Sequence, residues 1–310
     1  MNIDKSRWGI IYNPKAGSRR KQKRWDRIRE CLEARRVRYD YVQSEGYGSV
    51  ERLTRQLAES GYKTIVVVGG DGAMNDAVNG IMTSTVADDA ELALGLIPNG
   101  IGNDFARFWG IDSDNYEQAV DNILHRRLRR IDVGCIEYAN GEMKIKRHFV
   151  NAVNIGLTAR VVKITGEARR FWGIRRLSLL ASVIMLGFER KLYRSHLRIN
   201  GEHIRGRIMS VCVGSAHGYG QTPSAVPYNG WLDVSVIYRP KITGLLQGLR
   251  LLAKGRILNH KVVKPYRTRH VKVLRAQNAS VSVDGRILRE PECPMDISIE
   301  REKLNFIIPE

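Results

Sequence analysis

The sequence contains few cysteines, and their spacing fits neither a metal motif nor a redox motif. The four lie far apart in the chain of 310 residues: Cys31, Cys135, Cys212 and Cys293. This spacing favours buried free thiols in a reducing compartment over a disulfide framework. Residues 1–7 contain no apolar signal region, and the longest apolar run, residues 177–188, is too short to cross a bilayer. We therefore expect a cytoplasmic protein, and peripheral contact with the inner face of the membrane stays open.

Several common nucleotide-binding signatures are also absent. The chain has no Walker A spacing and neither the H-R-D nor the D-F-G motif of protein kinases. A dehydrogenase is not expected, because Phe105 stands where the third glycine of G-x-G-x-x-G belongs.

Acidic residues are scarce relative to basic ones. The chain has 32 Asp and Glu against 51 Lys and Arg, a formal net charge of +19, which favours anionic partners such as nucleotides, nucleic acid or acidic lipid head groups. The cations are scattered over both halves and form no basic stripe with interleaved aromatic residues. We therefore expect no nucleic-acid partner.

The most informative stretch is residues 65–80, IVVVGGDGAMNDAVNG. Its four consecutive aliphatic residues predict a strand buried on both faces, which is typical of a parallel sheet. Three glycines then predict a turn in which Asp71 is the only side chain, and a helix follows with Asn75 and Asp76 in its first turn. In an open α/β sheet, ligands collect beyond the carboxyl ends of the strands, and a helix N-terminus there attracts phosphate. The stretch therefore predicts a nucleotide site containing one carboxylate.

The same order of strand, glycine loop and helix occurs twice more. Residues 8–12 predict a strand leading into a loop at residues 13–18, and residues 93–97 predict one leading into residues 98–104. Residues 39–42 predict another strand, and helices are expected at residues 19–29, 50–60 and 115–125, with a further one from about residue 105. This alternation predicts an α/β domain with a parallel sheet. The loop at 13–18 is either a plain turn or a second loop facing phosphate. The basic cluster at 126–130 favours a solvated helix end over an anion site.

The pattern changes near Ile131, where we place a domain boundary between residues 1–130 and 131–310. Short alternating runs are separated by turn pairs that predict hairpins: Asn140-Gly141, Asn200-Gly201, Asn229-Gly230 and Asp284-Gly285. We expect a mainly antiparallel β domain, whose last strand could pack back on the first domain. Two helical segments interrupt it, at about residues 159–191 and 244–255. The first is either a core helix with basic ends, which is favoured, or a wall of an apolar substrate cleft near an acidic membrane.

A set of residues spread over nearly the full length matches one family pattern: Asn13, Pro14, Gly17, residues 69–72, Asn75, Asp76, Pro98, Gly100, residues 102–107, residues 131–134, Phe149, Asn151, Pro223, Ala225, Gly230, residues 232–233 and 284–285. In these residues the chain resembles the diacylglycerol kinase catalytic-domain family, the soluble lipid kinases that include sphingosine kinases. The glycine-Asp-glycine core also occurs in NAD kinases, whereas the Asn-Asp-Phe-Ala-Arg block and the β-rich second half are more specific to the lipid kinases.

The resemblance implies a two-domain fold that binds ATP in the cleft between the domains, with Mg²⁺ on the phosphates of ATP. It also implies that the protein acts in lipid metabolism and phospholipid biosynthesis. It implies that Asp71 holds Mg²⁺ or helps to take a proton from a lipid hydroxyl. The implied nucleotide-binding residues are Asn13, Pro14, Gly17, Ser44, Gly69, Gly70, Asp71, Gly72, Ala73, Met74, Asn75, Asp76, Gly100, Ile101, Gly102 and Asn103.

The chain departs from the family pattern at four positions. Ala73 and Ile101 replace usual threonines, and Asn229 replaces a usual aspartate of a structural Mg²⁺ site that some members carry. Arg286 stands where members often have a glutamate that is a candidate general base, and a guanidinium cannot accept a proton. Either Asp71, Asp284 or Glu290 then takes that catalytic role, or activity is weak or absent.

Three functions remain open on this basis. The leading one is an ATP-dependent kinase acting on diacylglycerol or a similar lipid alcohol, met at an acidic membrane surface. The others are a nucleotide-binding homologue that regulates without catalysis, and a NAD kinase. A homodimer is neither required nor excluded.

Overall fold

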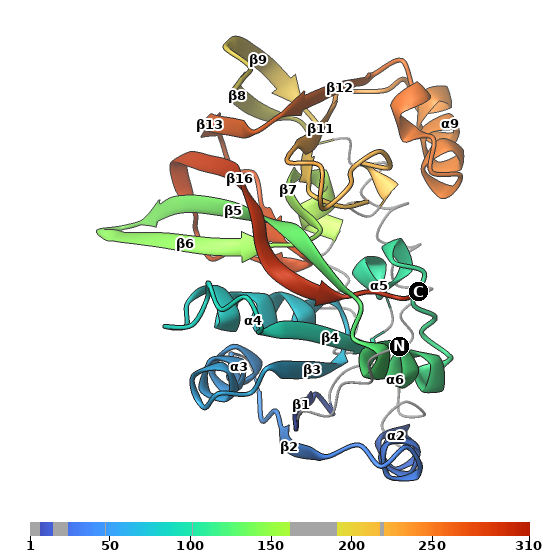
Figure 1. Cartoon of the computed structure of the whole chain (residues 1–310). Helices are drawn as coiled ribbons and strands as arrows, with labels where there is room; N and C mark the ends of the chain where they lie inside the picture. The colour runs from blue at the N-terminus through green and yellow to red at the C-terminus, as the bar shows by residue number, and fades with distance from the viewer. Residues whose placement is uncertain (1–6, 15–23, 47, 101, 162–190, 218–219) are drawn as a thin grey trace. The chain divides into compact units, whose positions relative to one another are not determined.

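The computed structural model describes residues 7–14, 24–46, 48–100, 102–161, 191–217 and 220–310 (Figure 1). The chain divides into two compact units. The first unit comprises residues 1–133 and 301–310, and the second comprises residues 134–300. We placed a boundary near Ile131 and expected that the last strand could pack back on the first domain; the last ten residues belong to the first unit.

The described part of the first unit contains a parallel sheet in the order β2-β1-β3-β4-β16. Its strands are β1 (Trp8–Tyr12), β2 (Tyr39–Gln43), β3 (Thr64–Gly69), β4 (Ala93–Pro98) and the end of β16 (Glu292–Ile307). Every residue of β1, β3 and β4 is buried, as the uninterrupted aliphatic runs predict. Asn305 and Phe306 of β16 pair with Ala93 and Leu94 of β4.

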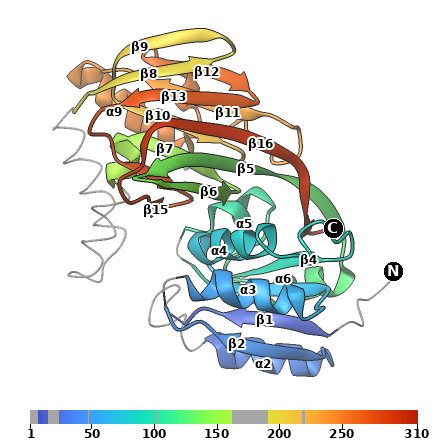
Figure 2. The ribbon, with the colours of Figure 1, turned by 90° about the vertical axis from the view of Figure 1, so that its left-hand side faces the viewer.

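Helices cover both faces of this sheet. In Figure 1, α3 (Ser49–Glu59) and α4 (Asp71–Met82) lie to the left of the strands, and α2 (Arg24–Ala34) and α6 (Tyr116–His125) lie to the right. Figure 2 shows α3 and α4 in front of the strands. Helices α3 and α4 approach closely at Gly80, where a Cβ atom would lie 2.5 Å from the carbonyl oxygen of Glu51. This is a doubly wound arrangement, and its strand order reverses between β1 and β3.

Aromatic packing fixes the short helix α5 (Asp104–Phe108) in the first unit. The ring of Phe306 in β16 lies 5.0 Å from that of Phe105 and 5.7 Å from that of Trp109. Because Phe306 and Phe105 are fully buried, the end of the chain holds α5 in place. This helix follows directly on the glycine loop after β4.

The second unit contains two antiparallel sheets. One has the order β16-β13-β8-β9, with β5 pairing to β16 and β6, and the other has the order β12-β11-β10-β7-β14-β15. The strands are β5 (Leu128–Asn140), β6 (Met143–Phe149), β7 (Ala152–Gly156), β8 (Tyr193–Ile199), β9 (Glu202–Ile208), β10 (Ser210–Gly214), β11 (Leu232–Ile237), β12 (Val263–Thr268), β13 (His270–Ala276), β14 (Val281–Val283) and β15 (Arg286–Ile287), with helices α9 (Ile242–Ala253) and η2 (Ile257–Asn259). One buried apolar cluster takes side chains from both sheets, among them Leu197 and Val211, so the sheets form a sandwich.

The structure confirms three of the four predicted hairpin turns. Asn140-Gly141 lies between β5 and β6, Asn200-Gly201 between β8 and β9, and Asp284-Gly285 between β14 and β15. In the last of these the φ angles are 44° and 79°, the positive values that a type I′ turn needs. Asn229-Gly230 instead forms a bend just before β11.

The predicted fold class, an α/β domain with a parallel sheet and a mainly antiparallel β domain, is confirmed, with local corrections. We expected one strand from each of the alternating runs at residues 144–153 and 207–213. Each run is divided between two strands, β6 and β7 in one case and β9 and β10 in the other. Strand β12 was not predicted because Pro265 interrupts its pattern, and it lies at the edge of its sheet, where proline is tolerated.

The cysteines and the predicted long helix have the following surroundings. Cys31, Cys135 and Cys212 are buried free thiols as predicted, but Cys293 is exposed because it lies among the exposed first residues of β16. The helix predicted at 159–191 begins at residue 157, and residues 162–190 of it lie outside the described residues. None of the described helices is both long and apolar enough to span a membrane.

Candidate functional site

The candidate site of the first unit lies where the strand order reverses. The carboxyl ends of β1 and β3 meet there, and the backbone N–H of Asn13 donates to the carbonyl oxygen of Val68 at 3.0 Å. On either side, the Ser44 N–H donates to the Tyr12 carbonyl and the Asn99 N–H to the Gly69 carbonyl. The loops after β1, β2, β3 and β4 are therefore linked along one edge of the sheet. Open α/β sheets bind their ligands at this position.

Two glycines bring the loops after β3 and β4 into contact. A Cβ atom on Gly70 would lie 2.8 Å from the Cα of Gly100, and a Cβ atom on Gly100 would lie 2.5 Å from the Cα of Gly70. Any larger residue at either position would force the loops apart. The site thus requires bare backbone at both positions, as a phosphate cradle does.

The side chain of Asn103 holds the second loop in shape. Its Oδ1 atom accepts from the Gly100 N–H and its Nδ2 atom donates to the Gly100 carbonyl oxygen, both at 3.0 Å. Asn103 is buried and has a left-handed backbone at φ 52°, a conformation that asparagine tolerates better than most residues. The side chain of Asn103 thus closes the glycine loop, and its predicted contact with the nucleotide stays a prediction.

The carboxylate of Asp71 joins the two loops. Its Oδ1 atom accepts a hydrogen bond from the backbone N–H of Phe105, in the first turn of α5, at 3.1 Å. Burial raises the pKa of Asp71 above its usual range, while the hydrogen bond from Phe105 and the charge of Arg107 oppose this rise. Asp71 is half-buried, and a carboxylate in this position whose charge is only partly compensated is a favourable ligand for a cation.

Helix α4 begins earlier than we predicted. It starts at Asp71, so Gly72 already belongs to it. Gly70 is the N-cap residue, and as a glycine it leaves the first backbone N–H groups of the helix without a side-chain cap. Asn75 and Asp76 consequently lie in the second turn and are buried, where they pack within the unit. The N-terminus of α4 points its positive dipole end at the turn containing Gly70.

The remaining predicted nucleotide residues have different surroundings. Gly69 ends β3, and a Cβ atom there would lie 2.7 Å from that of Ala73, so the alanine packs against the glycine turn. Met74 is fully buried, Ser44 is buried, and Pro14 and Gly102 are half-buried. Gly17 and Ile101 lie outside the described residues.

The carboxylate of Asp284, in the second unit, binds backbone. Its Oδ2 atom accepts from the Val150 N–H at 2.8 Å, and its Oδ1 atom accepts from the N–H groups of Asn151 and Ala152 at 3.0 and 2.8 Å. The chain leaves β6 and enters β7 at this point, so the carboxylate pairs N–H groups where the strand is interrupted. Asp284 thus has a structural role in this unit, and its predicted catalytic role stays a prediction.

The other residues of interest in the second unit are more exposed. Glu290 is exposed, with a left-handed backbone at φ 43°, and Arg286 is half-buried in β15. The Asn229 Oδ1 atom accepts from the Trp231 N–H at 2.9 Å. The carboxylate of Asp233, in the segment after Asn229, forms a bidentate ion pair with the guanidinium of Arg267, with N···O distances of 2.7 and 3.2 Å.

Sequence reasoning missed two elements of these sites. One is the Phe105 backbone N–H, which had no signal because any residue could supply it. The other is the group formed by Cys135, His148 and Glu300 in the second unit, whose ligand atoms lie within 4.8 Å of one another. Its members are far apart in the chain, so spacing rules for metal motifs could not find it.

Comparison with known proteins gives two domain matches. Residues 7–136 match the diacylglycerol kinase catalytic domain. Residues 151–308 match the domain described as the YegS C-terminal NAD kinase beta sandwich-like domain. Together the two matches span most of the chain and agree with the α/β and β-sandwich architecture.

Individual relatives agree with these matches. The lipid kinase-like protein YtlR of Bacillus subtilis (strain 168) is 32% identical over 180 residues, so the alignment spans just over half of each chain, 56% of this one and 56% of that one. The diacylglycerol kinase of the same organism is 23% identical and aligns over 89% of this chain and 88% of its own. A crystal structure of a diacylglycerol kinase-like protein from Bacillus anthracis str. Sterne has a TM-score of 0.75 at 21% identity, covering 98% and 97% of the two chains, which shows a shared fold.

Proposed function

This chain belongs to the diacylglycerol kinase catalytic-domain family, and from that membership we propose that it transfers the γ-phosphoryl group of ATP to a hydroxyl of diacylglycerol or a similar lipid alcohol. The observation that carries the proposal is the position of Asp71. Its carboxylate lies at the N-terminus of α4, beside the contact between Gly70 and Gly100, at the point where ligands bind in doubly wound sheets.

The residues of the first unit suit a triphosphate. Bare backbone at Gly70 and Gly100 lets phosphate oxygens approach, and the dipole of α4 favours their negative charge. Phosphoryl transfer is mainly positioning and charge stabilisation, which this arrangement can supply without a covalent step on the protein.

The donor set at this edge fits Mg²⁺, since a hard cation prefers carboxylate oxygens and phosphate. Asp71 would hold the ion, directly or through water. When bound, Mg²⁺ supplies a positive charge that stabilises the charge developing on the transferred group.

The alternative role for Asp71 is to accept the proton of the lipid hydroxyl, since a carboxylate that binds Mg²⁺ directly is a poor base. A carboxylate whose pKa is raised by burial is a better base than an exposed one. Asp284 suits this role less well because its oxygens already accept three backbone hydrogen bonds. Glu290 is exposed and remains the second candidate.

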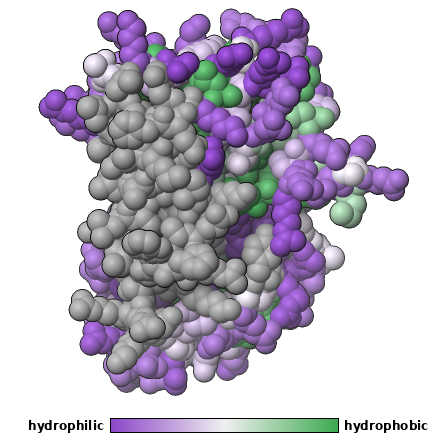
Figure 3. All heavy atoms as spheres, turned by 180° about the vertical axis from the view of Figure 1, so that it is seen from behind, coloured by the Kyte–Doolittle hydropathy of each residue, from purple (hydrophilic) through white to green (hydrophobic). Residues whose placement is uncertain are grey.

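We further propose that the lipid is met at an acidic membrane surface, with the protein bound peripherally to the inner face. A basic face of strands β8 and β9 supports this. In the register of these strands Arg194 lies opposite Arg207, His196 opposite Arg205, and Arg198 opposite His203. Arg194 and Arg207 place like charges on opposed residues, which destabilises a sheet, so an anionic partner would stabilise this face. Figure 3, seen from behind, shows hydrophilic side chains over much of the described surface on that side of the molecule.

Two other functions have specific support. Ala73 and Arg286 replace residues that carry polar or acidic groups in the family, which would suit a homologue that binds nucleotide without catalysis. The second domain is described as similar to that of NAD kinases, which would suit phosphorylation of NAD.

One assay separates the three functions. The purified protein is incubated with γ-labelled ATP, Mg²⁺ and either a total lipid extract or NAD. Label in the extracted lipid, dependent on Mg²⁺, is the expected result. Label in NADP alone would establish the NAD kinase function. Nucleotide binding without label in any product would establish the non-catalytic one.

A further inference from the structure

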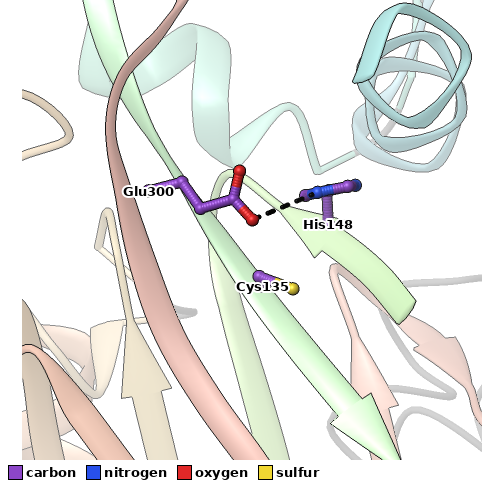
Figure 4. A group of neighbouring side chains, drawn as sticks. All are labelled: Cys135, His148 and Glu300. Atoms are coloured by element: carbon purple, nitrogen blue, oxygen red, sulfur yellow. Dashed lines mark ion pairs between the residues drawn. The ribbon is translucent and has the colours of Figure 1, made fainter. Parts of the chain in front are cut away.

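Three neighbouring strands of the second unit place a thiol, an imidazole and a carboxylate together. Cys135 in β5 is paired directly with His148 in β6, and β5 also pairs with β16, which carries Glu300. Figure 4 shows the three side chains beside one another. Nε2 of His148 lies 3.7 Å from Oε1 of Glu300, and the ligand atoms of the three residues all lie within 4.8 Å of one another.

We propose that Cys135, His148 and Glu300 form a zinc-binding site. A set of one sulfur, one imidazole nitrogen and one carboxylate oxygen is typical of Zn²⁺, which binds all three donor types. Hard cations such as Mg²⁺ would not select the thiol. This site is separate from the proposed nucleotide site, and the inference does not depend on the proposed function.

The distances suit a small tetrahedral ion. Zinc binds sulfur at about 2.3 Å and nitrogen or oxygen at about 2.0–2.2 Å, so its ligand atoms lie about 3.3–3.7 Å apart. The pair formed by His148 and Glu300 is already at 3.7 Å. Since no separation in the group exceeds 4.8 Å, side-chain movements of about 1 Å would complete the geometry.

Burial of the group also favours a bound ion. The exposed fraction is 1% for Cys135 and 3% for His148, and Glu300 is the side chain that reaches solvent, at 24%. Two of the ligand side chains are thus packed inside the sheet, and the third, Glu300, is partly exposed to water. Three protein ligands with one open position is a common zinc coordination, completed by a water molecule.

Lys146 is the competitor of the ion. Its Nζ atom lies 2.7 Å from Oε1 of Glu300, and its side chain is half exposed, so the ammonium group can move into solvent when a metal arrives. Without metal, Lys146 supplies the positive charge next to the carboxylate. Removal of Lys146 should therefore strengthen metal binding, whereas removal of a ligand should weaken it.

The bound ion would connect β6, β5 and β16 across one sheet. Binding to the folded state alone stabilises a protein in proportion to the logarithm of the metal concentration relative to the dissociation constant. Zinc would thus raise the thermal stability of the second unit. A residue of the site lies on each of three strands, so the effect should be lost when one ligand is removed.

The test uses Co²⁺ as a spectroscopic substitute for zinc, added to the purified full-length protein after removal of metal by a chelator. A bound Co²⁺ with a thiolate ligand gives a charge-transfer absorption band in the near ultraviolet, and Zn²⁺ should displace it. We expect this band in the parent protein and its loss in Cys135→Ser. The matched control Cys212→Ser removes another buried thiol and should keep the band. His196→Gln removes an exposed histidine that lies 2.8 Å from His203 and should also keep it.

Two further variants make the test independent of the Cys135 substitution. Glu300→Gln should weaken Zn²⁺ affinity by about tenfold or more, and Lys146→Gln should strengthen it, as measured by competition with a chromogenic chelator. Thermal denaturation without metal shows whether each variant is folded. The proposal is overturned if the parent gives no thiolate band, if the band survives in folded Cys135→Ser, or if Glu300→Gln and Lys146→Gln both leave the affinity unchanged.

Discussion

The carboxylate of Asp71 accepts a hydrogen bond from the backbone N–H of Phe105 at 3.1 Å. Asp71 is the first residue of α4 and Phe105 is the second residue of α5, and these helices follow neighbouring strands. One acidic side chain therefore sets the relative position of the two glycine loops in the proposed phosphate site. The charge and the shape of this side chain can be separated by substitution, because asparagine keeps an oxygen acceptor for the Phe105 N–H.

Asp71→Asn should lower phosphoryl transfer by about a hundredfold or more, because the neutral amide binds Mg²⁺ more weakly than a carboxylate and cannot accept a proton. The melting temperature should stay equal or rise, since burial raises the pKa of Asp71 and thus disfavours its charged form. Label transfer and thermal denaturation measure the two effects. Asp114→Asn, at an exposed carboxylate, is the control and should change neither. Undiminished turnover in Asp71→Asn would remove Asp71 from the mechanism.

Gly100→Ala should destabilise the protein by about 1–3 kcal/mol, the usual cost of overpacking, and weaken nucleotide binding. The new methyl group would lie 2.5 Å from both the Asn103 Oδ1 atom and the Gly70 Cα atom. Denaturant unfolding and titration with a nucleotide measure these effects. Gly46→Ala is the matched control, because no heavy atom lies within 4 Å of the added Cβ position. Equal stability of the two variants would contradict the close contact of the loops.

Asp284→Asn tests whether Asp284 acts in structure or in catalysis. It exchanges one acceptor oxygen for an NH₂ group while keeping a residue that tolerates the left-handed backbone. At least one of the three backbone N–H groups then loses its partner, so we expect a loss of about 1–3 kcal/mol in the free energy of unfolding. Glu290→Gln, on an exposed side chain, should leave stability unchanged. If the Asp284→Asn variant has the same free energy of unfolding as the parent protein but no longer phosphorylates lipid, Asp284 is catalytic.

Reversal of charge on the basic face should weaken binding to anionic membranes. In the double variant Arg198→Glu with Arg205→Glu, the affinity for phosphatidylglycerol vesicles should fall by about tenfold or more, since a basic residue near such a surface contributes about 1 kcal/mol. Sedimentation with vesicles at two salt concentrations measures this. Arg27→Glu with Arg52→Glu makes the same charge change at exposed positions of the first unit and is the control. Equal losses in both double variants would show that net charge alone drives binding.

Local patterns predicted the elements that surround the proposed site. The aliphatic run at 65–68 predicted β3, and glycines predicted the turn that carries Asp71. These patterns placed the start of α4 too late. Gly72 lies in the first turn of α4, but a glycine in a sequence predicts a turn, and only the packing of the folded chain shows that this one is helical. Strand β12 was missed for a similar reason, since Pro265 is acceptable only because its strand lies at a sheet edge.

The sequence by itself determined the alternation of strands and helices, the hairpin turns and the presence of an acid within a glycine turn, because each depends on neighbours within a few positions. Only the tertiary structure decided that Asp71 binds the N–H of Phe105, that Asp284 binds three backbone N–H groups, and that Cys135, His148 and Glu300 meet. These contacts join residues on different strands and loops. Their partners are set by the register and packing of the sheets, which no local pattern encodes.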